Sequence, residues 1–129
     1  MPSACLLDST VIIDAINDRN GRAELLESLI SEGTLLGCCP VNITEVHMGM
    51  RPHEAKLTEE FYQSLEFYPV TREIAKHAGE LYQEWRRKGR TLALPDLTIA
   101  AVAIANRLPL ATDNPKDFPM QELRLYPLP

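Results

Sequence analysis

Short apolar runs alternate along the chain with longer segments in which apolar residues recur every three or four positions. The short runs predict β-strands, and they lie at residues 4–7, 34–41, 108–113 and 123–128. The periodic segments predict helices, and they lie at residues 11–16, 21–33, 42–50, 53–65, 72–89 and 96–107. Strands that alternate with helices favour an α/β domain with a mainly parallel sheet covered by helices on both faces.

Several residues mark where the predicted helices begin or end. Ser9 and Thr10 are expected to cap the first helix, and Thr71 the helix of residues 72–89. Pro95 suits the first turn of the Ala-rich helix, and Gly33 suits the left-handed position that ends a helix.

The composition fits one globular domain spanning residues 1–129, since 45% of the 129 residues are hydrophobic and no repeat or linker interrupts them. The net charge of −5 excludes a generally basic surface for binding nucleic acid, although a local basic face remains possible.

Cys5, Cys38 and Cys39 show no metal-binding spacing and predict buried thiols in a reducing cytoplasm. With no export signal and no membrane-length apolar run, we expect no membrane partner.

Four acidic residues lie where active groups collect in parallel-sheet proteins, beyond the carboxyl ends of strands. Asp8 and Asp113 each follow a predicted strand, while Glu45 and Asp96 lie on helices that begin just after a turn. Carboxylates brought within about 4 Å repel by roughly 4 kcal/mol per pair at an effective dielectric near 20, so their convergence needs a cation. Oxygen-only ligands favour Mg²⁺ or Mn²⁺, and such an ion predicts hydrolysis of a phosphodiester bond.

Taken singly, each acid also fits an ordinary structural role. Asp8 suits a helix cap, Asp96 suits the positive end of a helix beside Pro95, and Glu45 suits an exposed helical position. The prediction of a metal site therefore depends on the set rather than on any one member.

Four segments carry a resemblance to a known family: LLDSTVIIDAI, VNITEVHMGM, LPDLTIAAVAIA and LATDNPKDF. Their order and spacing resemble those of PIN-domain proteins, especially VapC-like toxins of toxin–antitoxin pairs, and VTREIAKHAGELY between them is also similar to that family. The resemblance implies a three-layer α/β/α sandwich, Mg²⁺- or Mn²⁺-dependent endoribonuclease activity and homodimers. It further implies a small cognate antitoxin whose tail occupies the active-site groove. Asp8, Glu45 and Asp96 match the first three acidic positions of the family, which makes them the expected catalytic metal ligands.

The fourth acidic position of the resemblance is ambiguous in this sequence. The family often carries Asp or Asn two residues after the threonine that corresponds to Thr112, and that residue here is Asn114. We expect Asp113 to complete the site, ahead of Asn114 and then Asp117. Thr112 and Ser9 are candidate supporting groups, although hydroxyls at turns also satisfy nearby backbone groups. Asn42 stands where the family commonly has threonine, which leaves the local hydrogen bonding open.

A basic cluster precedes Asp96 and is the candidate RNA-binding surface, because Lys and Arg neutralise phosphates. Its members are Arg86, Arg87, Lys88 and Arg90. Cations at a helix C-terminus also suit the helix dipole, which is the alternative explanation.

Three other functions fit parts of the pattern. A receiver-type signalling domain shares the length and an acidic Mg²⁺ pocket, but it needs an acidic pair after the first strand and a lysine at a late strand end, and Lys116 lies instead within the KDF segment. A non-catalytic PIN module would bind RNA or protein without cleaving. A DNA nuclease would use the same chemistry on the other backbone.

Overall fold

The computed structural model describes residues 3–129 and contains a five-stranded sheet in the order β3–β2–β1–β4–β5. All neighbouring strands are parallel. The strands are β1 Ala4–Leu7, β2 Leu35–Cys38, β3 Glu66–Phe67, β4 Leu110–Ala111 and β5 Leu125–Tyr126. This confirms the predicted α/β fold with a parallel sheet. Residues 1 and 2 of the predicted domain 1–129 lie outside the described part.

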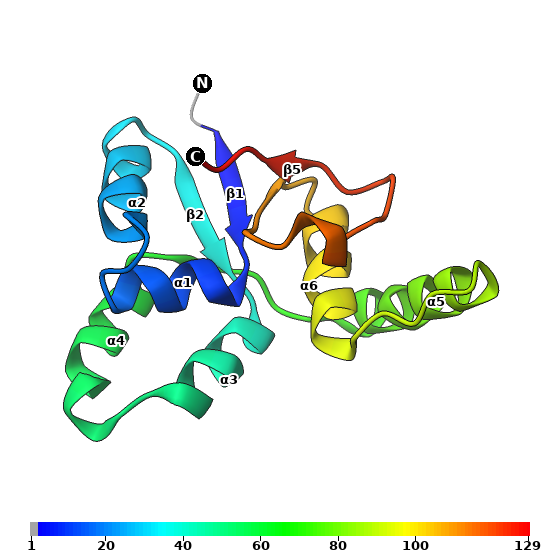
Figure 1. Cartoon of the computed structure of the whole chain (residues 1–129), viewed down its shortest axis with the longest axis horizontal. Coiled ribbons are helices and arrows are strands. Elements are labelled where there is room, and N and C mark those ends of the chain that lie inside the picture. The colour runs from blue at the N-terminus through cyan, green and yellow to red at the C-terminus, as the bar shows by residue number, and fades with distance from the viewer. Residues whose placement is uncertain (1–2) are drawn as a thin grey trace.

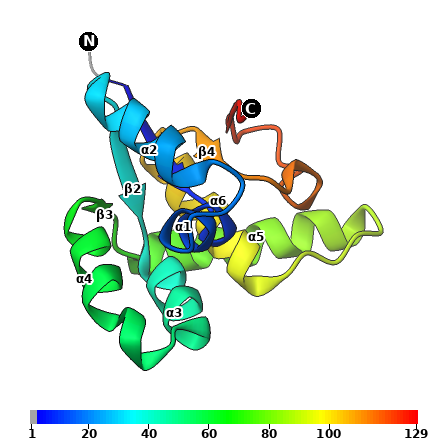
Figure 2. The same ribbon diagram turned by 60° about the vertical axis from the view of Figure 1, so that its left-hand side comes forward.

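Six α-helices connect and cover the strands (Figure 1). They are α1 Ser9–Ile16, α2 Arg22–Ser31, α3 Pro40–Gly49, α4 Ala55–Gln63, α5 Arg72–Arg87 and α6 Leu94–Ala105. Two single 3₁₀ turns, η1 Pro52–Glu54 and η2 Pro115–Asp117, complete the described elements. Figure 2 shows α5 extending to one side of the molecule and α3 and α4 on another, with α6 near the centre behind α1.

Two hydrophobic clusters lie on opposite faces of the sheet because side chains alternate along a strand. Leu6 of β1 belongs to the cluster that includes α5 and α6, whereas its neighbours Cys5 and Leu7 belong to the cluster beneath α1 and α2. A strand buried on both faces is typical of parallel sheets, and it explains why residues 4–7 form a continuous apolar run.

The structure decides how two helices start. Asp8, which the sequence also offered as a helix cap, caps α1 in place of Ser9 or Thr10, because its carboxylate accepts a hydrogen bond from the Ser9 backbone N–H. Helix α3 begins at Pro40 instead of Asn42, since proline needs no N–H partner in a first helical turn. The preceding strand is accordingly shorter than predicted and ends at Cys38.

Cys5, Cys38 and Cys39 are free and buried, as predicted, and burial raises the pKa of Cys5 and of Cys38 to about 11. Among residues 3–129, no helix has the length and apolar character that crossing a membrane requires.

The carboxyl ends of β1, β2 and β4 meet at one edge of the sheet. Helix α1 starts there directly after β1, helix α3 follows β2, and the 112–117 loop follows β4. The chain leaves β1 toward β2 on one side, while β4 pairs with β1 on the other side, so the strand order changes direction between β1 and β4, which is where parallel-sheet proteins commonly bind ligands.

Candidate active site

Asp8 lies at the end of β1 with both carboxylate oxygens hydrogen-bonded. Oδ1 accepts the Ser9 N–H at 2.8 Å, and Oδ2 accepts the Thr112 hydroxyl at 2.7 Å. The residue is only 6% exposed, and this burial raises its pKa, while the two hydrogen bonds act in the opposite direction. The negative charges of Glu45 and Asp117 raise the pKa of Asp8 further, so both carboxylates lie within electrostatic reach of Asp8.

Glu45 is joined to Asp8 through a short polar relay. Ser9 donates its hydroxyl to Glu45 Oε1 at 2.6 Å and accepts the Asn42 side-chain amide at 2.9 Å. Asn42 Oδ1 in turn accepts the Cys39 N–H at 2.8 Å, which anchors the amide at the start of α3. The Asn42 side chain is almost completely buried, so its geometry is fixed from both ends.

Sequence reasoning did not assign Asn42 to the site. The available signal was an amide at the third position of a helix that follows a strand, three residues before Glu45. A side chain there is able to reach back to the N-cap backbone.

Asp96 occupies the first turn of α6, directly after Pro95. Burial, followed by the negative charges of Asp8, Asp117 and Glu45, raises the pKa of Asp96 from 3.8 to about 6. The structure therefore brings Asp8, Glu45 and Asp96 into one electrostatic group, although they are distant in sequence.

The fourth member of this group is Asp117, which contributes negative charge at both Asp8 and Asp96. Asp113, placed first in the sequence prediction, instead forms an ion pair with the buried Arg22, whose Nη2 lies 2.5 Å from Asp113 Oδ1. Asn114 donates its backbone N–H to the Thr112 hydroxyl at 2.9 Å, which places it in the turn of the loop.

Within residues 3–129, none of the four carboxylates of Asp8, Glu45, Asp96 and Asp117 forms an ion pair; the ion pairs found there involve other acids. No three His, Cys, Asp or Glu side chains in the same residues lie in an arrangement ready to hold a metal ion. That finding is compatible with Mg²⁺, which keeps several waters and takes one or two protein carboxylates directly. An oxygen-only, uncompensated acidic group fits a hard divalent cation.

The predicted RNA-binding cations separate into two groups. Arg86, Arg87 and Lys88 are exposed at the end of α5, where Lys88 lies 4.4 Å from the centre of the Trp85 ring. Arg90 is half-buried on the returning loop and donates a hydrogen bond to the Lys116 carbonyl, next to Asp117.

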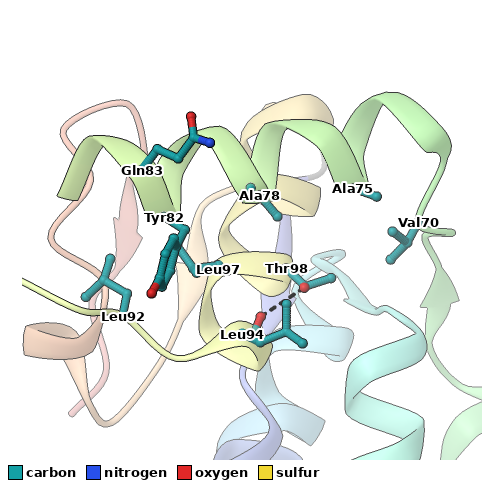
Figure 3. A pocket seen from close by; sticks show the side chains of 10 residues that line it. Val70, Ala75, Ala78, Tyr82, Gln83, Leu92, Leu94, Leu97 and Thr98 are labelled. Carbon is teal, nitrogen blue, oxygen red and sulfur yellow. Dashed lines mark hydrogen bonds between the residues drawn. The ribbon is translucent and has the colours of Figure 1, made fainter. Parts of the chain in front are cut away.

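A cavity of about 530 Å³ lies between α5 and α6, and none of the four acids lines it (Figure 3). The Tyr82 ring points from α5 toward Leu92 and Leu97, and Leu94 lies at the α6 side. The lining carries no charged side chain: it consists of Val70, Ala75, Ala78, Gly79, Tyr82, Gln83, Leu92, Leu94, Leu97 and Thr98.

The sequence of this chain is similar to a known domain family and to proteins named as ribonucleases. The model of the PIN domain family matches residues 5–119. Ribonuclease VapC19 of Mycobacterium tuberculosis is 31% identical over 115 residues, covering 89% of this chain and 92% of the relative. Ribonuclease VapC10 of the same organism is 33% identical over 117 residues, covering 91% and 87%.

The fold of this chain is also similar to those of solved toxin–antitoxin structures. VapBC2 from Rickettsia felis, crystallised with a promoter DNA fragment, superposes with a TM-score of 0.83 at 25% identity, over 95% of this chain and 97% of that one. A toxin–antitoxin complex from Klebsiella pneumoniae superposes with a TM-score of 0.77 at 26% identity, over 96% and 99%.

Proposed function

This chain belongs to the PIN-domain family, as a VapC-type ribonuclease toxin, and from that premise we propose how it cuts RNA. Asp8, Glu45, Asp96 and Asp117 hold Mg²⁺ or Mn²⁺ at the carboxyl edge of the sheet, with the whole chain, residues 1–129, as one catalytic domain. The observation that carries the proposal is the electrostatic group of four carboxylates without an ion-pair partner in residues 3–129. Such a group repels itself unless a cation enters it.

Each carboxylate has a distinct support. Asp8 is fixed by Thr112 and the Ser9 N–H, so its oxygens keep one orientation. Glu45 is oriented by the Ser9 hydroxyl, which itself is held by Asn42. Burial and the neighbouring carboxylates raise the pKa of Asp96 to about 6. This carboxyl therefore loses its proton when the site takes up positive charge.

A bound divalent ion supplies Lewis-acid polarisation of the phosphodiester and a water poised for in-line attack at phosphorus. The chain's own part is to orient that ion through fixed carboxylates and to bring the RNA backbone to it. Arg86, Arg87 and Lys88 are the exposed cations proposed to contact phosphates away from the cleavage point. Arg90, whose guanidinium is bonded to the Lys116 carbonyl, is better placed to act on the loop than on RNA.

Asp117, rather than Asp113, is proposed as the fourth carboxylate. Asp117 adds negative charge at Asp8 and Asp96, whereas the Asp113 charge is neutralised by Arg22. A carboxylate already paired with a buried guanidinium is a poor ligand, because binding the metal would leave that guanidinium unpaired.

The proposed macromolecular partners are a small cognate antitoxin and a second copy of the chain. The antitoxin is supported by related structures that are themselves toxin–antitoxin complexes. The homodimer is supported by the uncharged cavity between α5 and α6 and by Leu94 at its edge, which is 73% exposed. Free, buried cysteines are the usual state in a reducing cytoplasm, where we place the protein.

RNA digestion by the purified, antitoxin-free chain tests the proposed function. Wild-type protein is expected to cleave RNA with Mg²⁺ or Mn²⁺ and to stop when EDTA is added, while Asp96→Asn is inactive. Parallel digestion of single-stranded DNA separates a ribonuclease from a general nuclease. Uncleaved RNA together with unchanged binding of RNA would instead support a non-catalytic PIN module.

A further inference from the structure

The loop of residues 112–118 carries two aspartates that interact with different groups. Thr112 at its start is bonded to Asp8, and Phe118 at its end is 3% exposed in the core beside α5 and α6. Between these fixed ends, Asp113 pairs with Arg22, while Asp117 adds its charge to Asp8 and Asp96. The conformation of the loop therefore decides which of the two aspartates acts on the acidic group.

Arg22 holds the first half of this loop. It is the first residue of α2 and is only 6% exposed. Its Nη2 donates to Asp113 Oδ1 at 2.5 Å and to the Pro129 backbone oxygen at 3.2 Å, and its Nε lies 3.4 Å from Asp113 Oδ2. One guanidinium thus joins three segments, and its two-point contact with the carboxylate fixes the direction in which Asp113 points.

Arg90 holds the second half. It comes from the loop between α5 and α6, and its Nη2 donates to the Lys116 carbonyl. Lys116 is the middle residue of η2, which ends at Asp117, and the Asp117 N–H is bonded to the Asn114 carbonyl at 3.0 Å. Fixing the Lys116 carbonyl fixes the peptide plane that leads into Asp117.

We propose that Arg22 and Arg90 are positioning residues that set which aspartate of the 112–118 loop faces the metal site: Arg22 withdraws Asp113, and Arg90 directs Asp117 inward. The inference rests on the proposed metal-dependent function. It assigns Arg90 a role different from RNA contact, because the guanidinium acts on the protein's own backbone. Groups that orient a metal ligand affect metal affinity even when they do not touch the metal.

The test is a titration of RNA-free protein with Mn²⁺. Binding is measured as the loss of the free Mn²⁺ signal in electron paramagnetic resonance. Arg22→Gln and Arg90→Gln are each expected to weaken Mn²⁺ affinity about tenfold. In an Asp117→Asn background, neither substitution should weaken it further, because the ligand that they position is already gone. Arg124→Gln, which also removes a guanidinium bond to a backbone carbonyl, that of Arg107, is the matched control and should leave affinity unchanged.

Two results would overturn the inference. One is wild-type Mn²⁺ affinity in Arg22→Gln and Arg90→Gln; the other is equal weakening with and without Asp117, which would mean that the arginines only stabilise the fold. If circular dichroism shows that Arg22→Gln does not fold, Arg22→Lys replaces it, because lysine keeps the charge but not the two-point contact. Its Mn²⁺ affinity is then compared in the same way with and without Asp117→Asn. A wild-type protein that binds no Mn²⁺ would refute the proposed function itself, together with this inference. Arginine variants that bind normally would refute the inference alone.

Discussion

The Thr112 hydroxyl donates a 2.7 Å hydrogen bond to Asp8 Oδ2, and the two residues are 104 positions apart in the sequence. Asp8 also donates its backbone N–H to the Ala111 carbonyl at 2.9 Å. The ends of β1 and β4 are thus joined at the point where the acidic group forms. This bond orients one carboxylate and favours its charged form, which is the form that binds a metal ion.

Thr112→Val tests that bond, since valine keeps the shape and removes the donor. The pKa of Asp8, already raised by burial, is expected to rise further because a hydrogen bond that lowers it is lost. The pH needed for half-maximal cleavage should therefore move upward, with Mg²⁺ held constant. Thr98→Val, which removes a hydroxyl bond to the Leu94 carbonyl inside α6, is the control. Identical pH profiles for Thr112→Val and wild type would contradict the assigned role.

Asp96→Asn should make the metal-free protein more stable at neutral pH. An acid whose pKa is higher in the folded than in the unfolded chain holds its proton more tightly when folded, so stability falls as pH rises from about 4 through 6. Asparagine removes this loss. The gain in unfolding free energy at pH 7.5 is expected to be about 1 kcal/mol, reduced by solvent screening of a group that is not fully buried.

Urea unfolding in EDTA at pH 4 and at pH 7.5 measures this effect. The Asp96→Asn and wild-type curves should approach each other at pH 4, where the native carboxyl is protonated. A variant less stable than wild type at pH 7.5 would show that Asp96 is a structural cap rather than a member of a repelling group.

Ser9→Ala separates the orientation of Glu45 from the stability of the fold. The substitution removes the 2.6 Å bond to Glu45 while Asn42 keeps its bond to the Cys39 N–H. We expect kcat to fall by about tenfold or more, with a KM for RNA close to that of wild type, because phosphate contacts remain. Asn42→Ala, by contrast, also leaves the buried Cys39 N–H without its side-chain acceptor and should lower the unfolding free energy by about 2 kcal/mol. Equal loss of kcat in the Ser9→Ala variant and in an exposed control such as Ser28→Ala would exclude the relay.

Leu94→Glu tests the proposed homodimer. The glutamate introduced at the edge of the α5–α6 cavity would be buried in the dimer with no positive charge in the cavity lining to pair with it. Because burying an unpaired charge is costly, the dimer should dissociate at micromolar concentration. Light scattering coupled to size exclusion measures the mass directly. Ala105→Glu, at the other end of α6 and also exposed, serves as the comparison. A wild-type chain that is monomeric at high concentration would contradict the proposed homodimer.

The α/β class was predictable because the short apolar runs and periodic segments map onto strands and helices in the right order. Asp8, Glu45 and Asp96 were predictable as candidates because Asp8 follows a strand and the other two lie on helices that begin just after a turn, and the structure places all three in one group. The fourth position could be narrowed only to Asp113, Asn114 and Asp117, because the contacts of Arg22 with Asp113 and of Arg90 with the Lys116 carbonyl come from distant segments and leave no local trace in the sequence of residues 112–118. Asn42 was missed because its contact with the site, the bond to the Ser9 hydroxyl, spans 33 residues of sequence.

The central claim is that carboxylates from distant segments of the chain together bind a hard divalent metal ion, Mg²⁺ or Mn²⁺. The most direct measurement is a calorimetric titration of Mn²⁺ into RNA-free wild-type protein and into Asp8→Asn, each first stripped with EDTA. The account predicts saturable binding by wild type and at least about tenfold weaker binding by the variant. Equal affinity in both proteins, or no saturable binding by wild type, would contradict it.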